Sequence, residues 1–224
     1  MELMPGGSLR QLLDRSVEGG SSQGQQLPLD KRALRRIVMD VCSGLAFLHA
    51  AAFVHGGLSS TNVLLDAKGR AKVSDLSTLM RTSPASPPPH TPSYAETPGA
   101  TGIRSRYTAP EVLDGTADHS FESDTYSFGM LVLECLNPGL DWSDYSGEQG
   151  KGPPPAKRAP RDLRTIVEWC CALDPASRPA LDSIVFRSSS SGGGKSGRVV
   201  VISEASLADE RGNAAADAGL WEGR

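Results

Sequence analysis

The chain has 224 residues, 23 of them basic and 26 acidic, so its formal net charge is −3. This length suits one domain, or one and a half at most. Because there is no basic excess to attract phosphates, the composition argues against nucleic-acid binding and against attachment to an anionic membrane surface. The 24 glycines and 16 prolines exceed their usual frequency, so we expect part of the chain not to pack.

No apolar stretch reaches the ~18 residues that would cross a bilayer, and the first residues lack the basic flank and apolar run of a secretory signal. We therefore expect a soluble chain in the cytoplasm. The cysteines lack CxxC spacing and fall in or beside apolar helical stripes: Cys42, Cys135, Cys170 and Cys171. This placement favours buried, reduced thiols over metal ligands or disulfides.

Two helices are predicted before residue 52. Ser8 and Gln11 have the spacing of a capping box ahead of several leucines, which predicts a helix of about two turns that ends in glycine and serine. After the loop 19–28, Asp30 can cap a longer helix. Its apolar residues recur at intervals of three and four, opposite a charged face: Leu34, Ile37, Val38, Val41, Leu45 and Leu48.

A small hairpin is predicted next, because 62–65 and 71–73 have strand character and flank a turn that contains glycine. Residues 77–108 contain Ser, Thr and Pro with almost no apolar periodicity, which indicates a long exposed loop. Four hydroxyl residues in it precede proline: Ser83, Ser86, Thr91 and Thr97. Two interpretations stay open for them, namely substrates of a proline-directed kinase or residues of a flexible, solvated loop.

Two more helices are predicted in the second half. The segment 123–136 is apolar around almost its whole circumference, so we expect it to be buried on all sides. The Pro/Gly-rich segment 137–160 has basic residues but no interleaved aromatics, which favours a solvated loop over a binding patch. Apolar spacing over 163–173 then predicts a third amphipathic helix.

The C-terminal residues have a different composition. From Arg187 a run of serines and glycines leads into an Ala/Asp/Glu/Gly tail, with one apolar patch at 199–202. Such a composition cannot bury enough apolar surface to offset the entropy of ordering. We therefore expect a folded domain over 1–186, ending at Phe186, and a disordered Ser/Gly-rich linker and tail over 187–224.

Five motifs resemble, in order and in spacing, those of protein kinases. They lie at 53–65, 75–77, 109–111, 124–129 and 174–179. The first resembles the catalytic loop His-Arg-Asp-Leu-Lys-Pro-x-Asn and the strand after it. The others resemble the family's Asp-Phe-Gly, Ala-Pro-Glu, Asp-x-Tyr-Ser-Phe-Gly and Asp-Pro-x-x-Arg-Pro. Glu2 with Gly6-Gly7-Ser8-Leu9 is similar to the hinge and following helix of tyrosine-kinase-like Ser/Thr kinases.

The resemblance implies a mainly α (α+β) fold, the C-terminal lobe of a protein kinase with a small β-hairpin. It also implies that the N-lobe is missing from this chain, and with it the family's Gly-rich loop, phosphate-binding Lys and helix Glu. Three residues have structural roles in the family. Glu111 and Arg178 are expected to form the lobe's internal ion pair, and Asp124 is expected to anchor backbone near the catalytic loop.

The catalytic loop departs from the family pattern at three positions. Gly57 stands where the family has its catalytic Asp, and glycine cannot accept the proton of a substrate hydroxyl. Ser59 replaces the phosphate-directed Lys, and Gly56 replaces the Arg that pairs with a phosphorylated activation loop in many kinases. His55 is expected to be a packed structural histidine. No catalytic residue is therefore expected to be intact.

ATP and Mg²⁺ are implied as cofactors by the resemblance alone. Glu2 lies in the hinge-like segment, and Asn62 and Asp75 match the family's magnesium ligands, whose oxygen atoms suit a hard cation. In the alternative interpretation Asn62 only holds loop backbone and Asp75 only closes the hairpin. Two ligands without a phosphate clamp bind Mg²⁺ weakly, so we expect little nucleotide binding. Ser77, in place of glycine, restricts the backbone after Asp75.

Three functional interpretations follow. The one we favour is a pseudokinase-type interaction or scaffolding module with protein partners, because the structural motifs are intact beside a dismantled catalytic loop. The alternative is an ATP-dependent protein serine/threonine kinase, seen here as an incomplete chain. The third is a truncated gene model without an independent role. Without a small lobe, the surface around Leu64, Val73 and Leu76 is expected to expose apolar groups.

Overall fold

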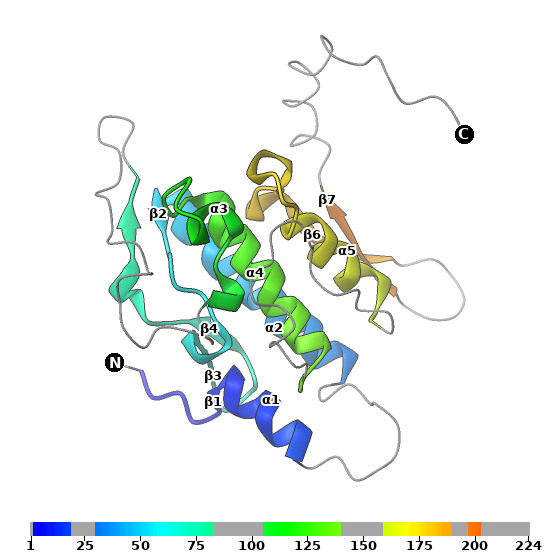
Figure 1. The fold of residues 1–224 in the computed structure, drawn as a ribbon. Coiled ribbons are helices and arrows are strands. Elements are labelled where there is room, and N and C mark those ends of the chain that lie inside the picture. The colour runs from blue at the N-terminus through cyan, green and yellow to red at the C-terminus, as the bar shows by residue number, and fades with distance from the viewer. Residues whose placement is uncertain (1, 19–29, 83–104, 140–158, 190–196, 203–224) are drawn as a thin grey trace, which may run out of the picture.

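The structure is a computed structural model, and it describes residues 2–18, 30–82, 105–139, 159–189 and 197–202. Three of its helices form the centre of the fold: α2 (Lys31–Ala50), α4 (Phe121–Leu136) and α5 (Arg161–Cys170). Figure 1 shows α4 in the middle, with α2 on one side and α5 on the other. The other described α-helices are α1 (Leu9–Glu18) and α3 (Pro110–Leu113). The expected mainly α character is confirmed.

The ends of the helices follow from their capping residues. Ser8 and Gln11 form the predicted capping box, each side chain bonding the other's backbone N–H at 3.0 and 3.2 Å, although α1 has ten residues and so exceeds two turns. The Asp30 carboxylate accepts from the first turn of α2, and these bonds hold the pKa of Asp30 below its usual value. Ser120 and Ser123 cap α4, which therefore starts two residues earlier than predicted.

A three-stranded antiparallel sheet lies at one end of the helices, in the order β1 (Gly7–Ser8), β3 (Val63–Leu65), β4 (Ala71–Val73). Its β3–β4 pair, with Val63 opposite Val73, is the predicted hairpin. The turn is held by the Asp66 carboxylate, which accepts from the backbone N–H groups of Lys68 and Arg70 at 2.7 and 2.8 Å.

One prediction for the long loop is wrong at its start. Strand β5 (Met80–Arg81) pairs with β2 (Phe53–Val54), so the first residues of the supposed loop belong to a sheet. Short 3₁₀ turns connect the remaining elements: η1 (Ser60–Asn62), η2 (Leu76–Thr78), η4 (Ser105–Tyr107), η6 (Pro175–Ser177) and η7 (Leu181–Ser183). The four hydroxyl residues that precede proline lie outside the described residues.

A second correction concerns the tail. Strand β6 (Ile184–Ser189) pairs antiparallel with β7 (Gly197–Ile202), so regular structure continues past Phe186, where the composition predicts disorder. The physical reason is the β-branched run 199–202, which has a high strand propensity and finds a partner in the strand that follows Leu181–Ser183. Residues 203–224 lie outside the described ranges.

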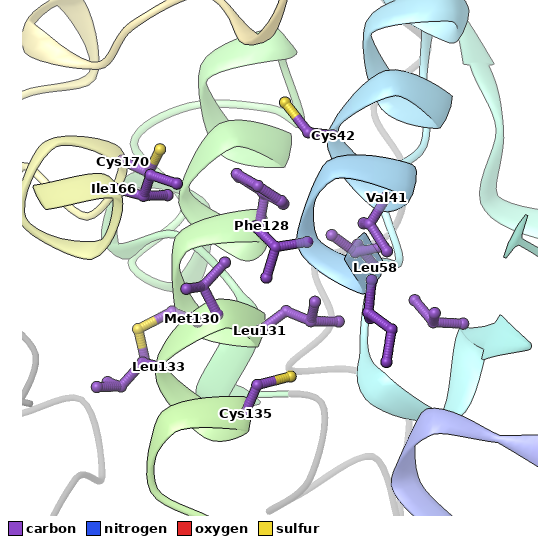
Figure 2. Packing of buried hydrophobic residues seen from close by; sticks show 14 of the residues in the cluster. Val41, Cys42, Leu58, Phe128, Met130, Leu131, Leu133, Cys135, Ile166 and Cys170 are labelled. Atoms are coloured by element: carbon purple, nitrogen blue, oxygen red, sulfur yellow. The ribbon is translucent and has the colours of Figure 1, made fainter. Parts of the chain in front are cut away.

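The core surrounds α4. All residues of 123–136 are buried except Tyr126, as the apolar circumference predicts. Figure 2 shows Phe128 and Leu131 of α4 facing Val41 of α2, with Ile166 of α5 on the other side. A bidentate pair between Arg35 and Asp162, at 2.5 and 2.9 Å, joins α2 to α5 directly.

All four cysteines are buried and free, as expected. Burial raises the pKa of Cys42 and of Cys171 to about 12, so these thiols stay protonated and unreactive at neutral pH. Among the described helices, none combines the length and the apolar character that crossing a bilayer requires.

The packing of α4 predicts that substituting two phenylalanines by alanine has very different effects on the free energy of unfolding. Phe128 is fully buried, whereas Phe47 on α2 is 74% exposed. We expect Phe128→Ala to lower the free energy of unfolding by about 3–5 kcal/mol, because it leaves a cavity in the core. The matched variant Phe47→Ala should change it by less than about 0.5 kcal/mol. Urea denaturation followed by circular dichroism measures both, and equal losses would contradict the packing.

Candidate functional site

The motif residues converge at the ends of two strands. The loop 55–59 follows β2 and leads through η1 into β3, while Asp75 follows β4. The Asn62 carbonyl accepts from the backbone N–H and the hydroxyl of Ser74, at 2.8 and 2.9 Å. Because Ser74 precedes Asp75, the hairpin brings Asn62 and Asp75 beside each other, although 13 positions separate them in the sequence.

Asp124 anchors this loop. Its carboxylate, 1% exposed, accepts from the backbone N–H groups of His55 and Gly56 at 2.7 and 2.9 Å, and lies 3.0 Å from Nε2 of His49. It sits in the first turn of α4, where the helix dipole stabilises a negative charge. The expected anchoring of backbone by Asp124 is therefore present.

His55 is a packed structural residue, as expected. Its ring is fully buried, with Nε2 3.1 Å from the Ser74 carbonyl and Nδ1 accepting from the Gly57 N–H at 3.2 Å. These contacts place the proton on Nε2 and occupy both ring nitrogens. The imidazole therefore ties the loop to the residue before Asp75 and has no nitrogen available to act as a base.

Gly57 has no room for a side chain. A Cβ atom at this position would lie 2.6 Å from Oγ1 of Thr78, which is itself held by a 2.8 Å hydrogen bond to the His55 carbonyl. At Gly56 the backbone has φ = 67°, and a Cβ atom would lie 2.8 Å from Cε of Met80. At both positions an atom of a neighbouring side chain, Thr78 Oγ1 or Met80 Cε, lies close to where a Cβ atom would stand.

A small pocket adjoins the loop. A pocket of about 20 Å³, which holds about one water, lies between residues 56–59, Tyr107, Thr108, His119 and Ser127. Burial lowers the pKa of His119, so this ring is neutral there at neutral pH. Ser59 is buried and shares a 2.8 Å hydrogen bond with Thr61, so it does not project a polar group toward a phosphate.

Asn62 and Asp75 both make local contacts. The Asn62 side-chain amide donates to the Gly57 carbonyl at 2.8 Å, and its Oδ1 accepts from Thr61 at 3.4 Å. Asp75 adopts a left-handed backbone (φ 58°, ψ 71°), and one of its carboxylate oxygens accepts from Ser77 at 2.6 Å. Oxygen atoms of both residues suit Mg²⁺. The described residues contain no group of three or more His, Cys, Asp or Glu side chains placed to hold a metal.

Glu2 lies at the edge of the three-stranded sheet, where it forms an exposed 2.5 Å ion pair with Lys72 of β4. Of the apolar residues expected to be uncovered nearby, Leu76 is 52% exposed, whereas Leu64 is half-buried and Val73 packs against the core. Leu3, which we did not predict, is also exposed. Leu3 and Leu76 are therefore exposed, whereas Leu64 and Val73 are partly covered.

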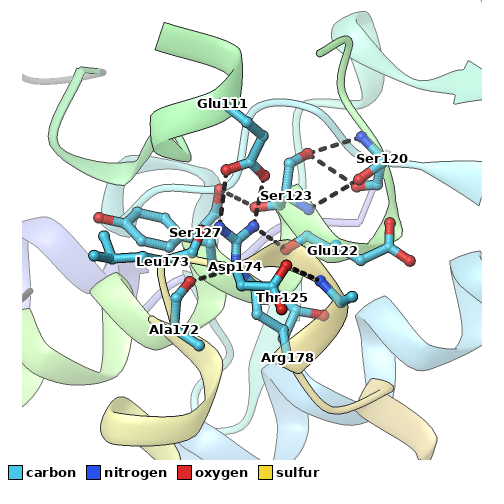
Figure 3. A network of polar contacts seen from close by, with 12 residues as sticks. Glu111, Ser120, Glu122, Ser123, Thr125, Ser127, Ala172, Leu173, Asp174 and Arg178 are labelled. Atoms are coloured by element: carbon cyan, nitrogen blue, oxygen red, sulfur yellow. Dashed lines mark hydrogen bonds and ion pairs between the residues drawn. The ribbon is translucent and has the colours of Figure 1, made fainter. Parts of the chain in front are cut away.

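The expected ion pair between Glu111 and Arg178 is present, with N–O distances of 2.6 and 2.8 Å. Figure 3 shows how the Arg178 guanidinium is enclosed. It also donates to the carbonyls of Ala172, Leu173 and Glu122, at 2.8, 3.2 and 3.1 Å. A buried cation with this many acceptors joins α3, the start of α4 and the segment after α5.

The sequence interpretation missed a second buried network. The Tyr107 hydroxyl donates to Glu134 and lies 3.1 Å from Ser60 Oγ, while Arg10 donates to Glu134 at 3.1 Å. Burial, with the Glu134 carboxylate adding to it, raises the pKa of Tyr107 well above its usual value. The sequence feature that could have indicated this network is Glu134, the one charged residue in the otherwise apolar end of α4. The role of Thr78 had no sequence signal.

The comparisons with known proteins all point to the same family. The family described as protein tyrosine and serine/threonine kinase matches residues 1–187. A probable serine/threonine-protein kinase from Dictyostelium discoideum is 26% identical over 82% of this chain and 13% of its own length. A probable leucine-rich repeat receptor-like protein kinase from Arabidopsis thaliana is 37% identical over 75% of this chain and 22% of its own length.

A third relative, a receptor-like protein kinase from Arabidopsis thaliana whose name includes the word inactive, is 34% identical over 58% of this chain and 19% of its own length. The chain thus spans less than a quarter of each of these three relatives.

The contacts of Asp124 predict a strong effect of a nearly isosteric change. Asp124→Asn replaces an acceptor oxygen with an N–H donor that faces other donors, so we expect it to lower the free energy of unfolding by about 3 kcal/mol. Asp114→Asn, at an exposed position, is the matched control and should change it little. Chemical denaturation measures the difference, and an unchanged midpoint for Asp124→Asn would show that the carboxylate does not anchor the loop.

Proposed function

The chain belongs to the protein tyrosine and serine/threonine kinase family, and we propose that it is a catalytically inactive member that serves as a protein-interaction module. The observation that carries this proposal is the state of position 57. The resemblance puts the proton acceptor for the substrate hydroxyl here, yet the residue is glycine, and Thr78 Oγ1 fills the space of a side chain.

The expected loss of rate is large. A positioned general base contributes about 10²–10⁴ to the rate of a proton-transfer step. Kinase chemistry further depends on charges that stabilise the transferred phosphoryl group. The loop supplies neither, because Gly57 has no side chain and the hydroxyl of buried Ser59 bonds to Thr61. These contacts support a loop that keeps its backbone shape without its chemistry.

The interaction role is supported by what the chain retains. Asp124 and Arg178, which hold the loop and the segment after α5, have their hydrogen-bonding groups paired within the lobe. These pairings support a fold that stays stable without catalytic groups, and exposed Leu3 and Leu76 offer apolar contact area to a partner. We propose protein partners, with no role for nucleic acid.

A second candidate is phosphoryl transfer from ATP to protein hydroxyls. The observation that favours it is the pair of oxygen ligands at Asn62 and Asp75, which the hairpin places together. When bound there, Mg²⁺ would neutralise nucleotide phosphates, and Glu2 would lie in the hinge segment of the family. The Ser77 hydroxyl competes for the Asp75 carboxylate, so we place this candidate second.

The first proposal predicts that no phosphoryl transfer occurs and that one substitution does not restore it. The native chain and Gly57→Asp should both fail to transfer radiolabelled phosphate from Mg·ATP to casein or to themselves. Gly57→Asp fails because its Cβ meets Thr78. Asp75→Asn serves as the background control, since it removes the carboxylate that would hold the metal. Transfer by the native chain above that background would overturn the inactive assignment.

Nucleotide binding is predicted separately. A ligand at 100 times its dissociation constant stabilises the folded state by about 2.7 kcal/mol, which is visible as a rise in melting temperature. We expect no such rise at millimolar Mg·ATP. A concentration-dependent rise that Asp75→Asn abolishes would instead establish a nucleotide site at Asn62 and Asp75, and would favour the second candidate.

A further inference from the structure

A cavity of about 300 Å³ lies outside the candidate site, and none of its lining residues belongs to the loop 55–59. Its walls come from three parts of the chain that are distant in sequence: the last turns of α2, the first turns of α4, and the segment 178–182. The proposed function does not use this cavity. Its volume is that of a small ligand site or of one long side chain with its neighbours.

The cavity has apolar walls. Ala46 and Ala50 line it from α2, Phe121 from α4, and Leu181 from the third segment. Phe47, the neighbour of Ala46, is 74% exposed, which makes it one of the most exposed large apolar residues of the described chain. An apolar group of a partner that binds next to the cavity can therefore pack against the exposed ring of Phe47.

Two carboxylates give the cavity a negative charge. Glu122 and Asp182 both line it and are both exposed. Within the described ranges no ion pair involves either of them. Figure 3 shows the Glu122 carboxylate turned away from Arg178, to which only its backbone carbonyl is bonded. The Arg178 charge is already engaged by Glu111, so it does not neutralise the cavity.

We propose that this cavity binds a basic segment of a partner protein, with one arginine or lysine side chain inserted between Glu122 and Asp182. There the cation meets two carboxylates and the ring of Phe121, which attracts it through its π electrons. An apolar neighbour on the same segment covers Phe47. The proposal extends the interaction role and rests on it for biological meaning.

The chain's own C-terminus is a poor occupant. Residues 203–224 contain five acidic and two basic residues, which gives them the same sign of charge as the cavity. Like charges brought together at an interface are unfavourable, and a partner of opposite charge is favoured. Residues 203–224 are therefore disfavoured as the occupant, and the proposal assigns the cavity to another protein.

The cavity also touches both anchors of the candidate site. His49 lines it and bonds the Asp124 carboxylate that holds His55 and Gly56. Arg178 lines it and holds Glu111 at the start of α3. A partner bound in the cavity thus contacts His49, which bonds the anchor of the loop, and Arg178, which bonds Glu111 of α3.

The test measures binding of a fluorescent, acetylated peptide of alternating arginine and leucine to the full chain, without nucleotide. We expect saturable binding that weakens as salt is raised. The double variant Glu122→Gln/Asp182→Asn should weaken it about tenfold, and Ala50→Phe, which fills the cavity, should weaken it by a similar factor. Glu168→Gln, at an exposed carboxylate of α5 outside the cavity, is the matched control and should leave binding unchanged.

Three results would overturn the proposal. They are no binding of the basic peptide at millimolar concentration, equal affinity for a peptide of alternating glutamate and leucine, and equal loss for Glu168→Gln and the cavity variants. Circular dichroism confirms that each variant is folded. Because the assay does not involve phosphoryl transfer, its failure would leave the inactive assignment standing, and detection of transfer would leave the peptide result standing.

Discussion

One buried carboxylate, that of Asp124, holds the candidate site to the rest of the lobe. Burying a charge is costly unless hydrogen bonds replace its water. Here two backbone N–H groups of the loop and the His49 side chain replace it. Because α4 is enclosed on nearly all sides, its first turn has a fixed position, and the loop inherits that position. The loop geometry therefore depends on α4 and α2 rather than on any ligand.

In this arrangement, the contacts that fix the backbone of the loop are separate from the side chain at position 57. The contacts that shape the loop use backbone groups and the His55 ring, so they do not require a carboxylate at position 57. Glycine at position 57 leaves these contacts intact. It also lets Thr78 approach the loop and bond the His55 carbonyl, a contact that a larger residue would prevent.

Local patterns predicted much of this structure from the sequence. The caps of α1 and α2, the β3–β4 hairpin, the burial of α4 and the pairing of Glu111 with Arg178 all depend on short spacings or on recognisable motifs. The failures involve contacts between distant segments. Glu134 meets Arg10 from 124 positions away, and β2 pairs with a strand that carries no apolar alternation. The spacing of side chains along the sequence does not indicate such distant partners. The β6–β7 pairing was missed because the prediction of disorder after Phe186 used composition alone.

The separation of Glu111 and Arg178 in the sequence affects how the chain folds while the ribosome is making it. Its two residues are 67 positions apart. At about 5–20 residues per second, a ribosome needs roughly 3–13 seconds to add the second after the first. During that interval α5 is still being made, and the apolar surface of α4 that it will cover remains exposed. The nascent chain therefore passes through a period in which its central helix is not yet covered by α5.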